Sequence, residues 1–206
     1  MYQERSHEKR TAVISKGNCL YGPAKRMLDL IGAFVGMLVF VLLYIPVAIL
    51  IKLDSPGPVL FAQERVGKDG KVFTMYKFRS MYADSLKFDF KPMSDADNRV
   101  TRVGRFLRRT SIDEIPQFIN VIRGEMSLVG PRPELAFIVE QFEPWQRERL
   151  TVLPGITGWW QVNGRKQPMH KHIEYDIYYI KNRSLLLDLK ILLMTIGAVI
   201  SGKGAI

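Results

Sequence analysis

Two adjacent carboxylates, Asp113 and Glu114, lie in a part of the chain that is rich in arginine. Arg108 and Arg109 come shortly before them, and Arg132 follows between two prolines. Adjacent acids in basic surroundings suit a site in which one carboxylate attacks the substrate or binds a metal, while guanidinium groups bind phosphate oxygens. These residues therefore suggest chemistry on a phosphorylated substrate.

The same stretch could instead be the start of a helix. Ser111 and Glu114 match the S-x-x-E capping box, and acids in a first turn complement the helix dipole. With Ser111 as the cap, Pro116 falls at the fifth helical position and removes a backbone bond, whereas a cap at Asp113 places it in the tolerant first turn. Local physics leaves the catalytic and the structural interpretations open.

The composition points to an anionic partner. The chain has 206 residues, and 30 Lys and Arg against 20 Asp and Glu give a formal net charge of +10. This length fits one domain with appendages, and the charge favours nucleic acid, an anionic membrane surface or phosphorylated substrates. The single cysteine, Cys19, excludes an internal disulfide and a multi-cysteine zinc site, and it fits a cytoplasm-facing location.

An uncharged run of 22 residues extends from Leu30 to Ile51. A membrane helix needs about 20 residues, so the run is long enough to enter a bilayer. It is too long and starts too late for a signal peptide. A buried core helix is the alternative for a soluble protein.

Both flanks of this run are basic, and Pro46 interrupts it. Positive charge marks cytoplasmic flanks, and a proline kinks or breaks a helix. A helix that breaks at Pro46 and returns to the same membrane face accounts for both observations, and a single kinked pass is the alternative. We therefore expect a basic tail over 1–24, a re-entrant membrane helix over 25–52 and a cytoplasm-facing catalytic domain over 53–206.

The rest of the chain predicts a mostly helical α+β fold. Short strands are expected at 59–63 and 71–76, joined across a Gly-rich turn as a hairpin. Residues 84–98 lack periodicity and predict a loop. Helices are expected at 103–109, 115–122, 135–142 and 172–181. The apolar stretch 185–200 contains two charges, which favours an amphipathic interfacial helix or a core helix over a membrane span.

Five sequence blocks within roughly residues 25–200 carry a family resemblance. In order, they are DSPGPVLFAQERVG, YKFRSM, SIDEIPQFINVIRGEMSLVGPRP, PGITGWWQVNGR and EYDIYYIKN. They resemble the small monotopic phosphoglycosyl transferases, bacterial enzymes that start the assembly of exopolysaccharides and glycoconjugates. Five blocks in one order are far more specific than a lone Asp-Glu pair.

The resemblance implies a reaction and a location. Family members transfer a sugar 1-phosphate from a UDP-sugar to a polyprenyl phosphate such as undecaprenyl phosphate, and UMP leaves. Catalysis in the family is ping-pong and requires Mg²⁺, which makes Asp113 the nucleophile and Glu114 its partner in binding the metal. The implied location is the cytoplasmic face of the bacterial inner membrane, in contact with phospholipids. Pro46 corresponds to the break in the family's re-entrant helix, although Ile45 stands where many members have Ser or Thr.

Further residues are candidates for binding the substrate. Lys77, Arg79, Arg108 and Arg132 are expected to contact phosphate, and Arg132 ranks first because its flanking prolines fix the backbone. A second set is expected to bind the nucleotide or the sugar: Gln161, Asn163, Arg165 and Asp176. A tight turn at Asn163 is equally open, and Asp176 could either assist the metal or form an ion pair with an arginine.

Two interpretations without catalysis stand beside the enzyme. The charge alone would also fit a membrane-tethered basic module, and an inactive transferase could act as an assembly scaffold. Basic and acidic residues are interleaved and the sequence contains no nucleic-acid-binding motif, so we expect no nucleic-acid partner. The identity of the sugar, the pathway and a homo-oligomeric state are left open by the sequence.

Overall fold

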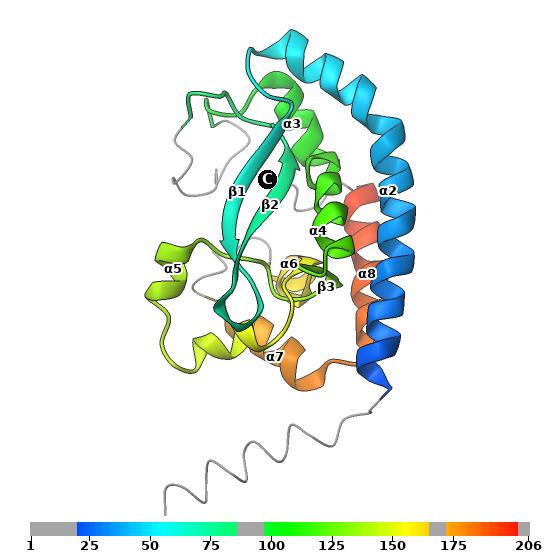
Figure 1. Cartoon of the computed structure of the whole chain (residues 1–206), viewed down its shortest axis with the longest axis vertical. Coiled ribbons are helices and arrows are strands. Elements are labelled where there is room, and N and C mark those ends of the chain that lie inside the picture. The colour runs from blue at the N-terminus through cyan, green and yellow to red at the C-terminus, as the bar shows by residue number, and fades with distance from the viewer. Residues whose placement is uncertain (1–19, 86–96, 165–171, 202–206) are drawn as a thin grey trace, which may run out of the picture.

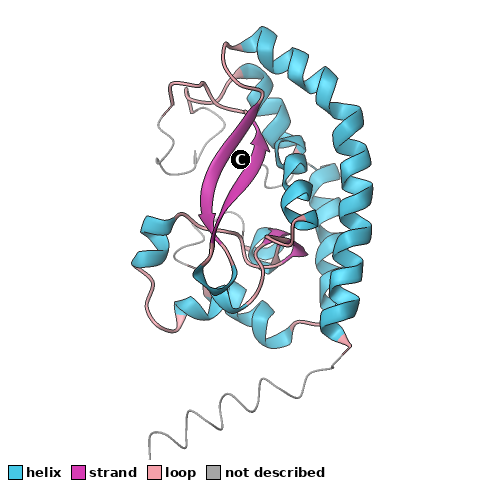
Figure 2. Cartoon of the chain, in the orientation of Figure 1, coloured by secondary structure: helices cyan, strands magenta, loops and turns pink. Residues whose placement is uncertain are grey.

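The computed structural model describes residues 20–85, 97–164 and 172–201 (Figure 1). A long helix, α2 (Tyr21–Asp54), runs along one side of the molecule, and α8 (Leu185–Ser201) lies beside its N-terminal half. The smaller elements pack on the other side of this helical pair. Helices predominate and the strands are short (Figure 2), as the predicted α+β class requires.

Helix α2 begins at Tyr21, inside the predicted tail, most of which lies outside the described residues. The helix continues through Pro46 to Asp54 and curves over the top of the molecule (Figure 1). Among the described helices it is the one that is long and apolar enough to cross a membrane, and only 17% of its most apolar window is buried. This exposure disfavours a soluble core helix, whereas the re-entrant topology stays a prediction.

A buried aspartate fixes α2 to the body of the protein. Asp29 Oδ1 accepts hydrogen bonds from the Leu128 amide and the Ser127 hydroxyl, both at 3.0 Å, and Lys25 Nζ lies 2.9 Å from it. Ser127 belongs to β3 (Ser127–Val129), so the helix is joined directly to a strand. The apolar helix and the rest of the fold are therefore held in a fixed relation.

The predicted hairpin is confirmed. Strands β1 (Leu60–Val66) and β2 (Val72–Phe78) pair antiparallel over their whole length, with Leu60 opposite Phe78. The connection η2 (Lys68–Gly70) contains Asp69 and Gly70 with φ of 56° and 77°, which is the backbone conformation that favours glycine and tolerates aspartate. Lys77 lies near the end of β2.

The Asp113–Glu114 pair follows α3 (Arg102–Arg109), which the periodicity placed correctly. The 3₁₀ helix η3 (Ile112–Gln117) contains both acids and continues into α4 (Phe118–Ile122). Ser111 adopts a left-handed conformation, φ 57° and ψ 15°, and its side chain makes no capping hydrogen bond. The predicted capping box is therefore wrong, because Ser111 precedes η3 without capping it through its hydroxyl.

The remaining elements complete the fold around the helical pair. The expected helices at 135–142, 172–181 and 185–200 appear as α5 (Ala136–Glu140), α7 (Glu174–Asn182) and α8. Strand β3 and three further elements were not predicted, namely η4 (Gln146–Thr151), β4 (Gly155–Thr157) and α6 (Trp159–Asn163). Strand β4 pairs in parallel with β3. The main core lies between this small sheet, β2, α7 and α8.

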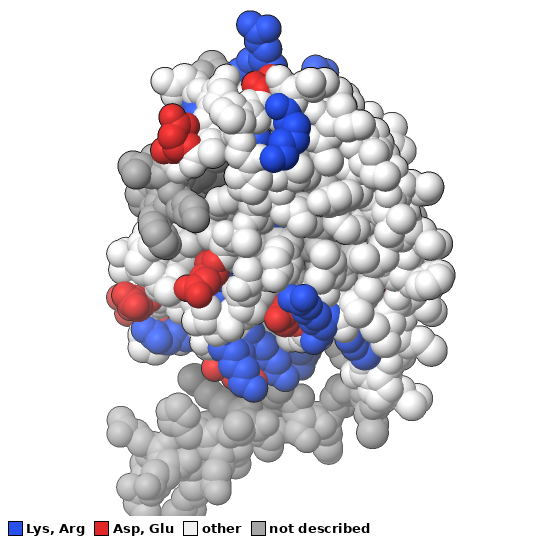
Figure 3. Space-filling model, turned by 45° about the horizontal axis from the view of Figure 1, so that its top comes forward, with Lys and Arg blue, Asp and Glu red and all other residues white. Residues whose placement is uncertain are grey.

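The surface divides into an apolar and a charged part. In the face shown by Figure 3, charged side chains gather away from the broad uncharged right-hand side. Large apolar side chains are exposed along α2 and α8, among them Phe34, Leu38, Leu42, Ile45, Leu193 and Ile196. Burying them in a bilayer would remove an exposed apolar area that monomeric soluble proteins rarely carry.

Candidate active site

The Glu114 carboxylate connects three separate parts of the chain. Its Oε1 atom accepts a hydrogen bond from Lys77 Nζ at 2.8 Å and from Arg132 Nη2 at 3.1 Å. Lys77 comes from β2, Glu114 from η3, and Arg132 from the loop after β3. Charge-assisted bonds of this length fix the carboxylate and concentrate positive charge beside it. The structure thus brings together the leading residues of the predicted site.

Asp113 is buried, with 7% of its surface exposed. Burial raises the pKa of its carboxyl to about 6, which Lys77 opposes and the negative charge of Glu114 reinforces. A carboxylate with a raised pKa is more basic than an ordinary aspartate, yet it is still largely ionised at neutral pH. These are useful properties for a nucleophile.

Arg108 approaches the pair from α3. Its Nε donates a hydrogen bond at 2.9 Å to the hydroxyl of Ser80, a buried residue just after β2. Burial lowers the pKa of Arg108, and the charges of Asp113 and Glu114 act in the opposite direction. Burial likewise lowers the pKa of Lys77. For Arg132, burial is outweighed by the charges of Glu114 and its acidic neighbours, so the pKa of the guanidinium is raised.

Arg79 lies apart from this cluster. Its Nη2 donates to the carbonyl of Ser55 at 2.7 Å and to that of Ile51 at 3.5 Å, and its Nη1 donates to the carbonyl of Pro56. These carbonyls belong to the C-terminal end of α2 and the turn after it. The guanidinium therefore satisfies a helix end, which favours a structural role over the expected phosphate contact.

Asp176 forms an ion pair rather than joining the two acids. Its Oδ2 lies 2.8 Å from Arg149 Nη2, and both side chains are 2% exposed. Burial raises the pKa of Asp176 to about 6, although Arg149 lowers it. Of the two interpretations that the sequence left open, the geometry favours the ion pair over metal binding.

Two of the residues expected to bind the nucleotide or the sugar, Gln161 and Asn163, lie on α6. The amide of Gln161 donates to the carbonyl of Ile156 at 2.7 Å, and that of Asn163 donates to the carbonyl of Trp159 at 3.0 Å. Both hydrogen bonds are local, and neither joins these residues to Asp113 or Glu114. Arg165 lies outside the described residues.

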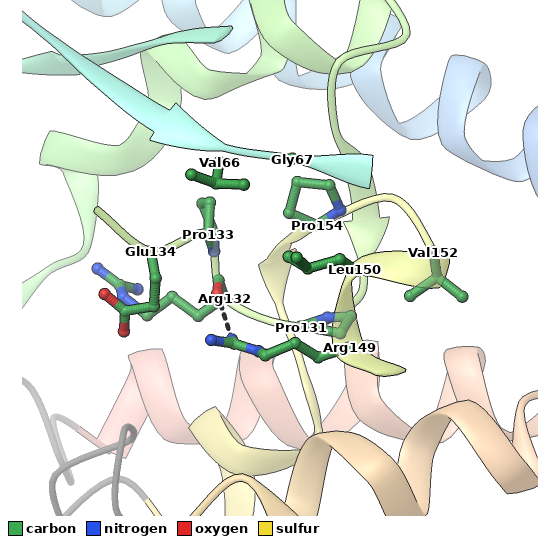
Figure 4. A pocket seen from close by; sticks show the side chains of 10 residues that line it. All are labelled: Val66, Gly67, Pro131, Arg132, Pro133, Glu134, Arg149, Leu150, Val152 and Pro154. Carbon is green, nitrogen blue, oxygen red and sulfur yellow. Dashed lines mark hydrogen bonds between the residues drawn. The ribbon is translucent and has the colours of Figure 1, made fainter. Parts of the chain in front are cut away.

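A small cavity adjoins the Arg132 loop (Figure 4). Its volume is about 10 Å³, which is the space of about one water molecule. The ten residues around it are Val66, Gly67, Pro131, Arg132, Pro133, Glu134, Arg149, Leu150, Val152 and Pro154. This cavity is too small for a nucleotide sugar.

Asp113 and Glu114 suit a particular kind of metal site. No group of three or more His, Cys, Asp or Glu residues gathers in the part of the chain that the structure describes. Mg²⁺ is usually bound by one or two carboxylates, with water and substrate phosphates as its other ligands. Two adjacent carboxylates beside the basic side chains of Lys77 and Arg132 fit a magnesium ion that arrives with a diphosphate.

Known proteins are similar to this chain over most of its length. Residues 20–202 match the family model described as bacterial sugar transferase. This chain belongs to the bacterial sugar transferase family. It is 46% identical over 193 residues to the UDP-N-acetylgalactosamine-undecaprenyl-phosphate N-acetylgalactosaminephosphotransferase of Aeromonas hydrophila. It is 42% identical over 181 residues to the UDP-glucose:undecaprenyl-phosphate glucose-1-phosphate transferase of Escherichia coli.

The length of the match differs among these bacterial sugar transferases. It covers 90% of this chain and 46% of the Aeromonas protein, and 84% of this chain and 39% of the E. coli protein. The uncharacterized sugar transferase EpsL of Bacillus subtilis is 42% identical, and the match covers 87% of this chain and 89% of EpsL. The chain thus spans less than half of the two phosphotransferases but most of EpsL.

Arg65 of this bacterial sugar transferase lies near the candidate site but was not predicted as a site residue from the sequence. Arg65 of β1 bonds to Gln63 Oε1 at 2.6 Å and lies 3.6 Å from Glu134, close to the Arg132 loop. Burial lowers the pKa of its guanidinium to about 10. The sequence marked Arg65 only as a basic flank of the apolar run. The available signal was its position two residues after the predicted strand at 59–63, within the predicted hairpin.

Proposed function

We propose that the chain transfers a sugar 1-phosphate from a UDP-sugar to undecaprenyl phosphate and releases UMP. The observation that carries this proposal is the buried Asp113 next to Glu114, whose carboxylate is held by Lys77 and Arg132. The names of the two phosphotransferase relatives support the substrates. The proposed place of the reaction is the cytoplasmic face of the bacterial inner membrane.

In the first half-reaction, an Asp113 carboxylate oxygen attacks the phosphorus that carries the sugar. The bond between this phosphorus and the oxygen that bridges to UMP breaks, and UMP leaves with the electron pair. The sugar 1-phosphate is then an acyl phosphate of Asp113. In the second half-reaction, an oxygen of undecaprenyl phosphate attacks the same phosphorus, which frees the Asp113 carboxylate and gives undecaprenyl diphosphate-sugar.

The cations near the two acids offset the charge of the substrate. An anionic nucleophile and a diphosphate repel each other, so the attack needs positive charge close to the phosphorus. Lys77, Arg108 and Arg132 provide three such charges around the two acids. Arg132 also binds Glu114, which fixes its guanidinium before the substrate arrives.

Mg²⁺ is the proposed cofactor, and Glu114 and Asp113 are the residues that would hold it. When bound, it would neutralise part of the diphosphate charge and so make the phosphorus easier to attack. Glu114 is already oriented by Lys77 and Arg132, so its contribution to a metal site would cost little reorganisation.

The apolar side of the molecule fits a substrate that lies in a membrane. Undecaprenyl phosphate presents its phosphate at the level of the lipid headgroups, so the enzyme must be held at that depth. The exposed apolar side chains of α2 and α8 would enter the bilayer, with α2 as a re-entrant helix that bends at Pro46.

Isotope exchange tests the proposal without a lipid acceptor. In a ping-pong reaction, labelled UMP enters the UDP-sugar pool because the first half-reaction is reversible. We expect Asp113→Asn to lower this exchange by a factor on the order of 10³ or more, since the nucleophile is lost. Asp69→Asn is a matched control, because Asp69 is exposed in the η2 turn and asparagine accepts its left-handed conformation.

The outcomes separate an enzyme from a binding module. Exchange that depends on Mg²⁺ and disappears only in the Asp113 variant supports the proposal. Exchange that survives Asp113→Asn would overturn the assigned nucleophile. A chain that exchanges no label with any UDP-sugar but still binds anionic vesicles would favour the non-catalytic module.

A further inference from the structure

Four consecutive carbonyl groups around Arg132 each accept a hydrogen bond from another part of the chain. The Pro131 carbonyl accepts from the Gly155 amide at 2.9 Å, and the Glu134 carbonyl accepts from the Val66 amide at 2.8 Å. The two carbonyls between them accept from arginine side chains. The Arg132 carbonyl accepts from Arg149 Nη2 at 2.5 Å, and the Pro133 carbonyl accepts from Arg65 Nη1 at 3.4 Å. The loop is thus fixed from β4, β1 and η4.

Arg149 makes the shortest of these four hydrogen bonds. Its acceptor is the carbonyl of Arg132, whose side chain contacts Glu114. Figure 4 shows this hydrogen bond as a dashed line between the Arg149 guanidinium and the Arg132 carbonyl. The position of Arg149 is set in turn by Asp176 of α7, at 2.8 Å, and by the ring of Phe142, 5.4 Å from its guanidinium carbon. A continuous series of contacts therefore runs from Asp176 through Arg149 and Arg132 to Glu114.

The burial of this ion pair is poor evidence for a stabilising role. Nε and Nη1 of Arg149 have no hydrogen-bond partner among the described residues, although both atoms are buried. A buried charge with unpaired donors costs free energy, and a buried ion pair often stabilises a protein less than apolar residues of the same volume would. The hydrogen bond from Arg149 to the Arg132 carbonyl therefore points to a role of this ion pair other than stability.

We propose that Arg149, held by Asp176, is a positioning residue that sets the place of Arg132 in the active site. It acts through the backbone of Arg132, so that the guanidinium reaches Glu114 and the diphosphate of the substrate. The inference rests on the proposed function, in which Arg132 binds phosphate. A displacement of about 1 Å in a reacting group can cost about 100-fold in rate, so a loss of this anchor is expected to affect catalysis.

A double-mutant cycle in the UMP exchange assay tests this inference. We expect Arg149→Met to lower kcat/KM for the UDP-sugar by about 10- to 100-fold while exchange stays measurable. In an Arg132→Lys background the same change should cost much less, because the guanidinium that Arg149 positions is already gone. Two residues that act through one another give non-additive effects, whereas independent ones add.

Arg147→Met is the matched control. Arg147 lies on the same η4 helix, is exposed, and donates to the carbonyls of Phe142 and Glu140 rather than to Arg132. We expect this variant to exchange UMP within a few-fold of the wild type. Its small effect should be the same in the wild-type and Arg132→Lys backgrounds.

Two milder variants keep the test decisive if Arg149→Met does not fold. Arg149→Lys retains a charge that can donate to the Arg132 carbonyl, and Asp176→Asn retains the shape of its side chain. We expect both to fold, to keep more activity than Arg149→Met where that variant can be assayed, and to show the same coupling to Arg132→Lys. Thermal melting of each variant separates lost stability from lost positioning.

The results distinguish the inference from the function on which it rests. Additive losses at Arg149 and Arg132, or full activity in Arg149→Met, would overturn the positioning role while the wild-type exchange upholds the function. A wild type that exchanges no UMP with any UDP-sugar would overturn the proposed function and the positioning role with it.

Discussion

At the scale of single residues, the active site depends on how charge is balanced around two carboxylates. Glu114 has two cationic partners and is fixed, whereas Asp113 is the more buried of the two acids and its pKa is raised. The two neighbours can therefore play different roles despite their similar chemistry. In the proposed reaction, Glu114 would orient the cations, and Asp113 would keep the basicity that a nucleophile needs.

Lys77→Met tests this balance. The change removes one partner of Glu114 and the group that most lowers the pKa of Asp113. We expect a loss of UMP exchange of about 10²- to 10³-fold, as for other preorganised electrostatic contacts. Because the pKa of Asp113 should rise above about 6, less of it is ionised at pH 6, and the deficit should be larger there than at pH 8.

Arg123→Met is the control for Lys77→Met. Arg123 is exposed and contacts the hydroxyl of Tyr76, the neighbour of Lys77, without reaching Glu114. Exchange close to the wild-type rate is expected for it at both pH values. A Lys77→Met variant with an unchanged pH profile would contradict the assigned influence of Lys77 on Asp113.

At the scale of elements, close backbone packing brings α3 to the site. A Cβ atom on Gly104 would lie 2.0 Å from the carbonyl oxygen of Ser80, so only glycine lets α3 approach the end of β2 this closely. The same contact brings Arg108 within reach of the Ser80 hydroxyl. The position of Arg108 therefore depends on a residue with no side chain.

Gly104→Ala tests this packing. In an open helix this change stabilises a protein by about 1 kcal/mol, but here the added methyl group must push α3 away from β2. We expect a lower melting temperature and slower UMP exchange. Gly197→Ala in α8 is the matched control, because nothing lies within 4 Å of its Cβ position, and it should be neutral or mildly stabilising. Equal melting behaviour of the two variants would contradict the argument.

Local signals explain which elements could be predicted. The hairpin has a turn that contains Asp69 and Gly70, and most of the helices have apolar periodicity, so each could be recognised from its own residues. Strands β3 and β4 contain three residues each and pair across 28 positions, Ser127 with Gly155, which leaves no local pattern. Asp113, Glu114, Lys77 and Arg132 were predicted from residue type and from the resemblance. The role of Arg79 at the end of α2 could not be predicted, because it depends on tertiary contacts.

At the scale of the whole molecule, the apolar side and the site are held together by buried polar contacts. Asp29 joins α2 to β3, and Asp188 of α8 accepts hydrogen bonds from Tyr21 at 3.0 Å and Tyr179 at 2.8 Å. The helices that would enter the membrane are thus fixed to the strand that leads into the Arg132 loop. Such a connection would hold the site at a constant depth relative to the lipid headgroups.

The path of α2 relative to the membrane gives the last prediction. The helix bends at its upper end and both of its flanks are basic, which favours a return to the cytoplasmic face. Single cysteines near residue 10 and at Lys68, in a Cys19→Ser background, should react with an impermeant maleimide from the same side. Lys68 is exposed in the η2 turn, so its reactivity reports the side on which the hairpin lies. Labelling of the two cysteines from opposite sides would establish a full span, and the site would then lie across the membrane from the N-terminus.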